Sequence, residues 1–256
     1  MAAFGLLVIG DEILSGRRED RHFPTVRRLL VDRGLRLAWV SYLGDDRARL
    51  TEALRRSFAA ADIVFSTGGI GATPDDHTRQ AAAAALGVPL ALHPEAATLI
   101  EARTREVNLP LTPERLRMGE LPVGATLIPN PVNRIPGFSL GEHHFVPGFP
   151  TMATPMIEWV LDTHYQAFFT DEAWLERSVI IFGAMEATLT PLMEAIEREH
   201  VGVKVFSLPS VDHPQFGRHI ELGVKGAPGQ VTAAYAALLE GLKPFDVKLG
   251  PELVHP

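Results

Sequence analysis

Cysteine is absent from the 256 residues of the chain. Disulfide bridges, thiolate metal centres and cysteine nucleophiles are therefore excluded. No apolar run approaches the ~20 residues that a membrane-spanning helix needs. Residues 1–10 also lack the basic segment and the cleavage site of a secretory signal. From these absences we expect a soluble, cytoplasmic protein with no membrane partner.

Basic residues are fewer than acidic residues in this chain. The 24 lysines and arginines are outnumbered by 31 aspartates and glutamates, which leaves a formal net charge of −7. Duplex binding depends on a basic face that displaces counterions, so we expect no nucleic-acid partner. The rest of the composition, with 46% hydrophobic residues, is ordinary for a globular protein with a sizeable core.

Apolar runs and helical repeats alternate along the first two thirds of the chain. Residues 4–9 and 63–66 are short continuous apolar runs that end at glycines, as in strands buried on both faces of a parallel sheet. Residues 35–43 are typical of a further strand. Helical spacing of apolar residues is found at 23–31, 47–60, 77–86 and, after a segment rich in proline and glycine (109–150), at 152–163. This alternation predicts βαβ units.

A second unit begins near Thr170. Its pattern predicts a strand (175–182), a helix (189–199), two strands (204–208 and 218–224) and a helix (230–242). This βαββα order is typical of a small α+β domain, and we expect the tail from Lys243 to be loosely packed. The sequence thus predicts an α/β protein, with a three-layer αβα domain and a mostly parallel sheet over residues 1–168 and a small α+β domain over residues 169–256.

A glycine-rich loop, TGGIGATPDDHT (67–78), follows the apolar run at 63–66 and precedes a helix. Glycines let backbone N–H groups approach a ligand closely, and a nearby helix N-terminus favours an anion such as phosphate. The loop lacks the lysine of a Walker A loop and the third glycine of a dinucleotide fingerprint, so neither chemistry is predicted. Thr73 and Pro74, followed by Asp76, also have the form of a helix start.

Acidic residues stand after three of the predicted strands. They are Asp11 and Glu12, which follow Gly10, then Asp45 and Asp46, and finally Asp75 and Asp76. Mg²⁺ typically takes one or two carboxylates together with phosphate oxygens, so these turns predict a site for a divalent cation and a phosphate. Two plainer interpretations stay open: Asp75 and Asp76 only offset the helix dipole, or strand-end turns simply favour glycine and aspartate.

Two segments rich in proline and glycine, residues 130–138 and 146–150, come late in the first domain. They offer Phe138 or Phe149 to stack on a flat ring, or else they are ordinary turns with buried phenylalanines. His143 and His144 are adjacent. Because neighbours on a strand point to opposite faces, we expect no metal to be shared between them.

Four motifs in register resemble those of one family. Residues 67–78 are similar to T-G-G-x-G-x-T-x-D-D-x-T, residues 9–16 to I-G-x-E-[IL]-L-x-G, residues 130–138 to N-P-x-x-x-x-P-G-F and residues 146–150 to [LV]-P-G-x-P. These motifs belong to the molybdopterin-binding domain of MoaB and Mog proteins and, in closest likeness, to the N-terminal part of competence/damage-inducible protein A (CinA). The resemblance covers residues 4–165 and, more weakly, residues 175–245. It does not extend to the C-terminal amidohydrolase domain of CinA.

The resemblance implies a Mog-like αβα core of molybdenum-cofactor biosynthesis type, which binds molybdopterin or an adenine nucleotide with Mg²⁺ or another divalent cation. It implies catalytic roles for Asp45 and Asp76, and metal ligation by Asp45, Asp75 and Asp76. The ligand-binding residues that it implies are Gly10, Asp11, Glu12, Thr67, Gly68, Gly69, Gly71, Thr73, Asp75, Asn130, Arg134, Pro147 and Gly148.

The chain departs from the family pattern at three places. Asp20-Arg21-His22 stands where the family often has Asp-Thr-Asn, Asn133-Arg134 where it often has Gly-Thr, and Thr151-Met152 where it often has Ser-Glu. The first and last changes remove polar contacts, whereas Arg134 adds a guanidinium that is suited to phosphate.

Three functions are compatible with these residues. The first is a Mg²⁺-dependent hydrolase or transferase acting on a nucleotide pyrophosphate such as ADP-ribose or on an adenylated pterin, with His77 or Asp75 as the candidate general base. The second is a non-catalytic module that binds a pterin or nucleotide, and the third is a structural partner with a vestigial site. We also expect a homodimer, because members of the family assemble and because Phe138, Phe149, Met152 and Trp159 predict an apolar patch.

Overall fold

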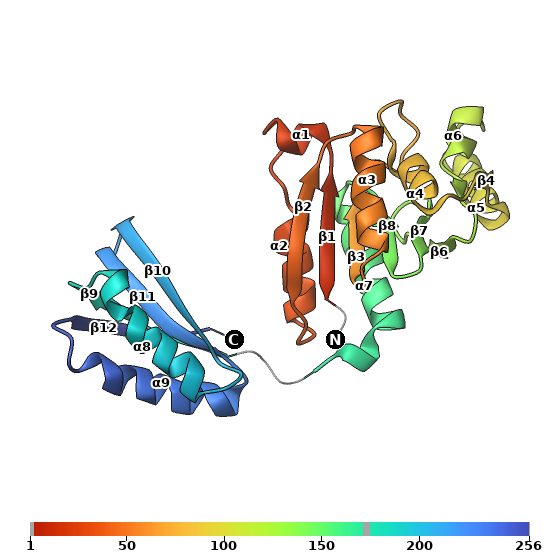
Figure 1. The fold of residues 1–256 in the computed structure, drawn as a ribbon. Helices are drawn as coiled ribbons and strands as arrows, with labels where there is room; N and C mark the ends of the chain where they lie inside the picture. Colours follow the sequence, from red (N-terminus) through yellow and green to blue (C-terminus); the bar gives the residue numbers. More distant parts are fainter. Residues whose placement is uncertain (1–2, 171–174, 256) are drawn as a thin grey trace. The chain divides into compact units, whose positions relative to one another are not determined.

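The computed structural model describes residues 3–170 and 175–255. The chain divides into two compact units, Met1–Phe169 and Thr170–Pro256 (Figure 1). The boundary expected from the sequence, after residue 168, lies next to this division.

The first unit alternates strands and helices. In chain order its elements are β1 (Phe4–Ile9), α1 (Asp11–Leu14), α2 (His22–Val31), β2 (Leu37–Leu43), α3 (Arg47–Phe58), β3 (Ile63–Thr67), α4 (Thr78–Leu86), β4 (Leu90–Leu92), α5 (Pro94–Glu106), α6 (Pro113–Arg117), β5 (Glu120–Pro122), β6 (Thr126–Ile128), β7 (Gly137–Leu140), β8 (His143–Val146), α7 (Pro150–His164) and a 3₁₀ turn, Gln166–Phe168. The small strands β4 and β5 pair antiparallel with each other.

Six strands form the main sheet, in the order β2-β1-β3-β8-β7-β6. β2, β1, β3 and β8 run parallel, whereas β7 is antiparallel to β8 and β6 is antiparallel to β7. β1 is buried along its whole length because helices cover both faces of the sheet, which explains its continuously apolar sequence. The expected mostly parallel sheet is confirmed.

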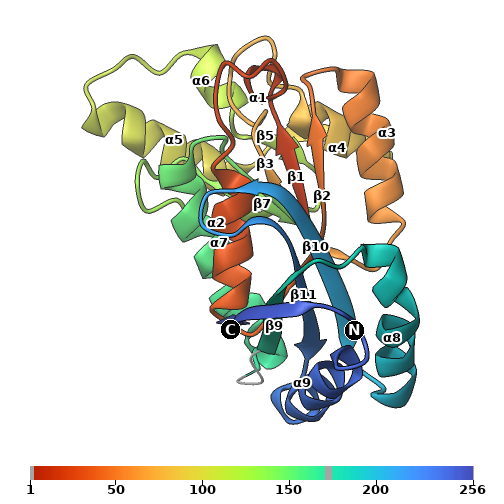
Figure 2. The same cartoon turned by 90° about the vertical axis from the view of Figure 1, so that its left-hand side faces the viewer.

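Alternate residues of β1 point to two helical layers. Leu6 and Val8 pack with α2 and α7 in one core cluster, and Leu7 and Ile9 pack with α3 and α4 in the other. Figure 2 shows the same arrangement, with α2 and α7 on one side of the strands and α3 and α4 on the other. This is the three-layer αβα architecture that the sequence predicts.

The four parallel strands end at one edge of the sheet. The residues that follow them are Gly10 after β1, Gly44 after β2, Gly68 after β3 and Pro147 after β8. Two backbone bonds hold the loop starts together, from Gly10 N to Leu43 O (3.0 Å) and from Gly68 N to Val146 O (3.0 Å). Ligands of open parallel sheets bind at this carboxyl edge, so the fold gathers four loops where a site is expected.

Helix α4 begins at Thr78, next to the start of the helical spacing at 77–86, and the helix start suggested by Thr73, Pro74 and Asp76 is not formed. The carboxylate of Asp76 accepts hydrogen bonds from the backbone N (2.7 Å) and the hydroxyl (2.5 Å) of Thr73. Asp76 thus closes a turn over residues 73–76 instead of capping the helix. A serine, threonine or aspartate can form either a turn or a helix cap, which is why residues 73–76 have the form of a helix start without being one.

The segment 130–150 is more regular than expected. Gly137–Leu140 forms β7, and its Phe138 is 1% exposed and stacks on Phe145 of β8 with ring centroids 4.5 Å apart. Phe138 therefore belongs to the core and cannot stack on a ligand or form part of an exposed patch. Phe149, in contrast, is 53% exposed.

The second unit is a four-stranded antiparallel sheet with two helices. Its elements are β9 (Leu175–Phe182), α8 (Glu186–Glu199), β10 (Lys204–His213), β11 (Gly217–Gly226), α9 (Pro228–Leu242) and β12 (Lys248–His255), with the strand order β10-β11-β9-β12. Apolar residues of both helices form one core with β9 and β11. No helix in the described ranges is both long and apolar enough to cross a membrane.

The tail of the second unit is a strand, which corrects the expectation of loose packing from Lys243. β12 pairs antiparallel with the inner strand β9, from Lys248 opposite Phe182 to His255 opposite Glu176. The register shifts between Leu249 and Glu252. Gly250 and Pro251 lie at that irregularity. Because neither residue is typical of a strand, the sequence pattern does not predict one here.

Candidate functional site

A cavity of about 570 Å³ opens at the carboxyl edge of the main sheet. Residues from all four loops line it. They include Gly10, Glu12 and Arg18 after β1, Asp45 after β2, Gly68, Gly69, Ile70, Gly71, Ala72, Thr73, Asp75 and Asp76 after β3, and Pro147, Gly148, Phe149 and Met152 after β8, with Met118, Asn133, Ile135 and Pro136 completing the wall. The structure therefore brings together acidic turns that are far apart in the sequence.

The start of the glycine-rich loop is packed so tightly that only glycine fits. Gly68 and Gly69 have φ angles of +99° and +67°, in the region that side chains rarely adopt. A Cβ on Gly68 would lie 2.2 Å from the carbonyl oxygen of Ile9, and one on Gly69 would lie 2.2 Å from Thr78 Oγ1. Thr78 in turn donates from its hydroxyl to Gly68 O (2.9 Å). The loop is thus fixed between β1 and the first turn of α4.

Four consecutive backbone N–H groups of this loop are free. Gly68 N is used in the sheet, and Thr73 N donates to Asp76, but the N–H groups of residues 69–72 find no acceptor among the described residues. All four residues line the cavity. Successive free N–H groups with nearby positive-φ glycines favour an anion.

Asp45 and Asp11 are joined by two hydrogen bonds. Asp11 N donates to Asp45 Oδ2 (2.9 Å), and Asp45 N donates to Asp11 Oδ1 (3.2 Å). Burial raises the pKa of Asp45, and the negative charges of Asp11, Glu12 and Asp75 raise it further against the lowering effect of the Asp11 hydrogen bond. This edge of the sheet consequently carries an excess of negative charge that a cation offsets.

Asp75 and Asp76 differ in their surroundings. Asp75 is exposed, and hydrogen bonding by Thr73 lowers its pKa. Asp76 is half-buried, and the Oδ2 that accepts from Thr73 is also the atom that a Cβ on Gly71 would approach to 2.6 Å. Within the described ranges, no three His, Asp or Glu side chains are arranged to hold one metal ion. A cation at this edge therefore needs ligand oxygens besides those of the protein.

Four of the residues expected to bind the ligand lie outside the cavity wall. Asp11 is hydrogen-bonded to Asp45, and Thr67 is fully buried with its hydroxyl 3.4 Å from Leu7 O. The side chain of Asn130 folds its own loop by accepting from Val132 N (3.0 Å) and donating to Ile135 O (3.0 Å). These contacts are structural.

Arg134 is the fourth expected ligand-binding residue that lies outside the cavity wall. Its position does not support the expected contact between its guanidinium and phosphate. Its backbone φ is +64°, and its guanidinium lies 3.7 Å from the carboxylate of Glu106. Its neighbour Asn133 lines the cavity in its place. The turn held by Asn130 determines which of the two side chains points inward, and no spacing in the sequence reveals that choice.

Arg79 is a buried residue of the site that the sequence does not indicate. It is 1% exposed and donates through Nη2 to Gly71 O (2.7 Å), and through Nη1 to Glu120 O (3.2 Å) and Arg117 O. Burial lowers its pKa. Arg79 thereby ties the glycine-rich loop to the segment between α6 and β5. In the sequence it resembles any surface arginine in the first turn of a helix.

We expect Arg79→Met to lower the free energy of unfolding of the first unit by about 2–4 kcal/mol. The substitution removes the Arg79 donor from three part-buried carbonyls, each loss costing up to about 1–3 kcal/mol, while removal of a buried charge offsets part of the loss. Differential scanning calorimetry measures the effect. The control is Arg28→Met, because Arg28 is exposed and its ion pair with Asp32 (3.4 Å) is worth about 0–1 kcal/mol. Equal unfolding temperatures for the two variants would contradict the role given to Arg79.

His143 and His144 have structural partners on opposite sides of β8. His143 Nε2 bonds with Ser57 Oγ (2.7 Å), and His144 bonds with Ser139 Oγ (2.8 Å) and the hydroxyl of Tyr165 (2.6 Å). Burial lowers the pKa of His143 to about 4 and that of His144 to about 3, so both are neutral at pH 7. Neither histidine lines the cavity.

Comparison with known proteins adds to this geometry. The chain is 31% identical over 248 residues to a protein of Pyrobaculum calidifontis and covers 95% of it. It is 37% identical over 161 residues to a CinA-like protein of Anaeromyxobacter sp., of which it spans 39%. A solved structure, titled as the protein CinA with unknown function from Thermoplasma acidophilum, matches 62% of this chain and 96% of its own with a TM-score of 0.56 and 27% identity.

The family described as probable molybdopterin binding domain matches residues 5–166. This range contains every loop that lines the cavity and ends within the first unit. The resemblance inferred from the four sequence motifs is confirmed. The chain belongs to the molybdopterin-binding domain family, with a CinA-like first unit.

Proposed function

We propose that the protein is a divalent-cation-dependent hydrolase or transferase whose substrate is a nucleotide pyrophosphate of the ADP-ribose type or an adenylated pterin. One observation carries the proposal. The four free N–H groups of residues 69–72 and the carboxylates of Asp45, Asp75 and Asp76 line the same cavity. N–H groups bind phosphate, and carboxylates repel it unless a cation lies between them.

Each group of residues in the cavity has a role that follows from its chemistry. The N–H groups of residues 69–72 hold one phosphate, while Asp45 and Asp75 supply carboxylate oxygens, which are the ligands that Mg²⁺ prefers. When bound, Mg²⁺ neutralises phosphate charge and orients water. Asp76 keeps the loop closed through Thr73. His77 and Asp75 are the candidates for the general base, because both stand at the end of the loop.

A turnover assay tests this proposal. Purified protein is incubated with ADP-ribose, FAD or NADH and with Mg²⁺, Mn²⁺ or Co²⁺, and the products are separated by chromatography. We expect cleavage of at least one pyrophosphate, which stops when EDTA removes the cation. Absence of cleavage under every combination of compound and cation, by protein that binds one of these compounds in calorimetry, would overturn the catalytic proposal.

The alternative is a module that binds a pterin or nucleotide without turnover. Two observations favour it: no three-ligand metal cluster exists in the described part of the chain, and one oxygen of Asp76 is already engaged by Thr73. Mass spectrometry of a ligand that co-purifies with the protein identifies the compound. An intact ligand after incubation with each cation supports the module, and its cleavage excludes it.

We further propose a homodimer in which a second chain covers the exposed apolar residues of the first unit. Phe149 and Trp159 are 53% and 37% exposed, although Phe138 is not available for such a contact. Exposed aromatic groups of this kind often mark contacts between chains. Light scattering at micromolar concentration is expected to give about twice the 28.0 kDa of one chain. A mass of one chain, unchanged by added ligand, would contradict the dimer.

A further inference from the structure

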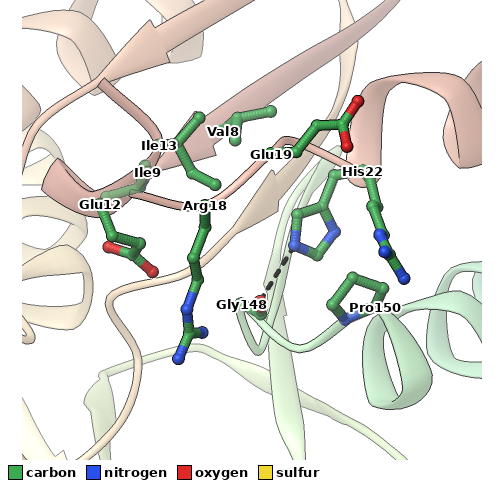
Figure 3. A pocket seen from close by; sticks show the side chains of 10 residues that line it. Val8, Ile9, Glu12, Ile13, Arg18, Glu19, His22, Gly148 and Pro150 are labelled. Atoms are coloured by element: carbon green, nitrogen blue, oxygen red, sulfur yellow. Dashed lines mark hydrogen bonds between the residues drawn. The ribbon is translucent and has the colours of Figure 1, made fainter. Parts of the chain in front are cut away.

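A second, smaller cavity lies beside the first. It has a volume of about 270 Å³ and is lined by Val8, Ile9, Glu12, Ile13, Arg18, Glu19, Arg21, His22, Gly148 and Pro150 (Figure 3). Four of these residues, Ile9, Glu12, Arg18 and Gly148, also line the cavity that holds the glycine-rich loop. The two cavities are therefore neighbours that meet at the end of β1 and at Gly148.

The wall of the smaller cavity is held firmly in place. Arg18 N donates to Glu12 O (3.0 Å), and Asp20 accepts from His22 N (2.7 Å) and from the hydroxyl of Tyr42 (2.7 Å). The ring of His22 is buried, and its Nε2 bonds with Gly148 O (3.1 Å). Burial lowers the pKa of His22, which keeps the ring neutral at pH 7 as a donor to that carbonyl. The segment 15–22 is thus anchored to β2 and to the loop after β8.

Arg18 lies where the two cavities meet, and its guanidinium has no ion-pair partner among the described residues. Neither Arg18 nor Arg21 forms an ion pair with any described residue. Of the lysines and arginines in the described ranges, Arg18 alone lines the larger cavity, where four carboxylates also lie. Figure 3 shows its side chain extending to the level of Gly148, whereas the carboxylate of Glu19 points the other way.

The small cavity itself suits an uncharged group with a polar edge. Val8, Ile13 and Pro150 supply apolar surface, and the charges of Glu12 and Glu19 balance those of the two arginines in number. Its volume of about 270 Å³ is less than half of the about 570 Å³ of the larger cavity, so it suits the smaller portion of a ligand that occupies both. Arg18 lines both this space and the larger cavity, which the free N–H groups of residues 69–72 also line.

We infer that Arg18 binds a second anionic group of the ligand, and that the small cavity accepts the portion attached to that group. The inference rests on the proposed function and adds where each phosphate of the organic pyrophosphate binds: one on the glycine-rich loop and the other on the Arg18 guanidinium. A planar guanidinium binds phosphate with paired donors, so the second phosphate gains a directional contact that a monophosphate does not reach.

Calorimetric titration with ADP-ribose and with AMP tests this inference. Both compounds carry adenosine, but only ADP-ribose carries a second phosphate and a sugar beyond it. The titrations use Ca²⁺ in place of Mg²⁺, and chromatography afterwards verifies that the ADP-ribose is intact. The proteins are the wild type, Arg18→Gln and the control Arg17→Gln. Arg17 is an exposed neighbour with the same charge and lines neither cavity.

We expect Arg18→Gln to weaken ADP-ribose binding by about tenfold or more, the loss of one charged hydrogen-bonding contact, and to leave AMP binding within about twofold. Arg17→Gln should leave both affinities unchanged. If Arg18→Gln weakens the binding of ADP-ribose and of AMP equally, or leaves both affinities unchanged, the role of Arg18 is overturned. The proposed function then still stands. If the wild type binds neither compound, the nucleotide pyrophosphate proposal fails, and the Arg18 inference fails with it.

Discussion

Replacement of Asp45 by asparagine is expected to reduce cation-dependent turnover by about 100-fold or more, which corresponds to roughly 2.7 kcal/mol of lost transition-state stabilisation. The asparagine amide is isosteric with the carboxylate, and its oxygen still accepts the hydrogen bond from Asp11 N (2.9 Å). The change therefore removes the charge that is proposed to hold the cation and leaves the loop in place. Initial rates at saturating Mg²⁺ measure the effect.

The same substitution is expected to stabilise the protein when no divalent cation is present. The pKa of Asp45 is raised in the folded state, by burial first and then by neighbouring carboxylates. Stability that is present below the ordinary aspartate pKa of 3.8 is consequently lost as pH rises through the raised value. The asparagine side chain does not titrate, so the unfolding temperature of the variant should rise relative to that of the wild type as pH increases above 3.8.

Asp46→Asn provides the matched control. Asp46 is the next residue, carries the same charge and lies outside the cavity wall. Its side chain caps α3 by accepting from Arg49 N (2.8 Å), and asparagine caps a helix about as well as aspartate. This variant should keep wild-type turnover. Equal activity of the Asp45 and Asp46 variants would show that Asp45 does not hold the cation.

Gly69→Ala is expected to abolish binding of the phosphate ligand and to lower the free energy of unfolding by about 2–3 kcal/mol. The left-handed backbone costs a side chain about 1–2 kcal/mol. The Cβ also meets Thr78 Oγ1 at 2.2 Å, which displaces the hydroxyl that donates to Gly68 O, a bond worth about 0.5–1.5 kcal/mol. Movement at this point shifts the four free N–H groups of residues 69–72.

Gly87→Ala is the control that separates the cost of the left-handed backbone from the cost of the contact with Thr78. Gly87 has a φ of +70°, close to the +67° of Gly69, but a Cβ there meets no atom within 4 Å. It ends α4 and does not line the cavity. The free energy of unfolding of this control variant should fall only by the cost of the left-handed backbone. In titration calorimetry the variant should bind ADP-ribose as the wild type does. Unimpaired binding by folded Gly69→Ala would mean that the loop is a turn without a role in binding.

The sequence is sufficient for features that depend on local periodicity. The runs at 4–9 and 63–66 are continuous because both faces of their strands are buried, and that alone predicts a parallel sheet. Because parallel strands share a carboxyl edge, the acidic turns at Asp45 and Asp75 are expected to meet, and both line one cavity. No long-range information is needed for either inference.

Features that depend on tertiary contacts are beyond the reach of sequence patterns. Arg79 is buried because α6 and β5 fold over it, which its helical neighbours do not reveal. Arg134 turns away because Asn130 shapes the preceding turn. β12 is recognisable only through its pairing with β9, since Gly250 and Pro251 interrupt its pattern. In each case the deciding partner lies elsewhere in the chain.

The position of β8 in the sheet has a consequence for the order of folding. β8 (His143–Val146) inserts beside β3 (Ile63–Thr67), so the chain between them must be complete before the two strands can pair. Gly68 N then donates to Val146 O (3.0 Å), which makes this late, long-range closure a condition for the geometry of the glycine-rich loop. Pairings across such long stretches of chain are slow to form. A nascent chain that ends before Val146 therefore carries every residue of the loop and still lacks the hydrogen bond that fixes the loop at Gly68.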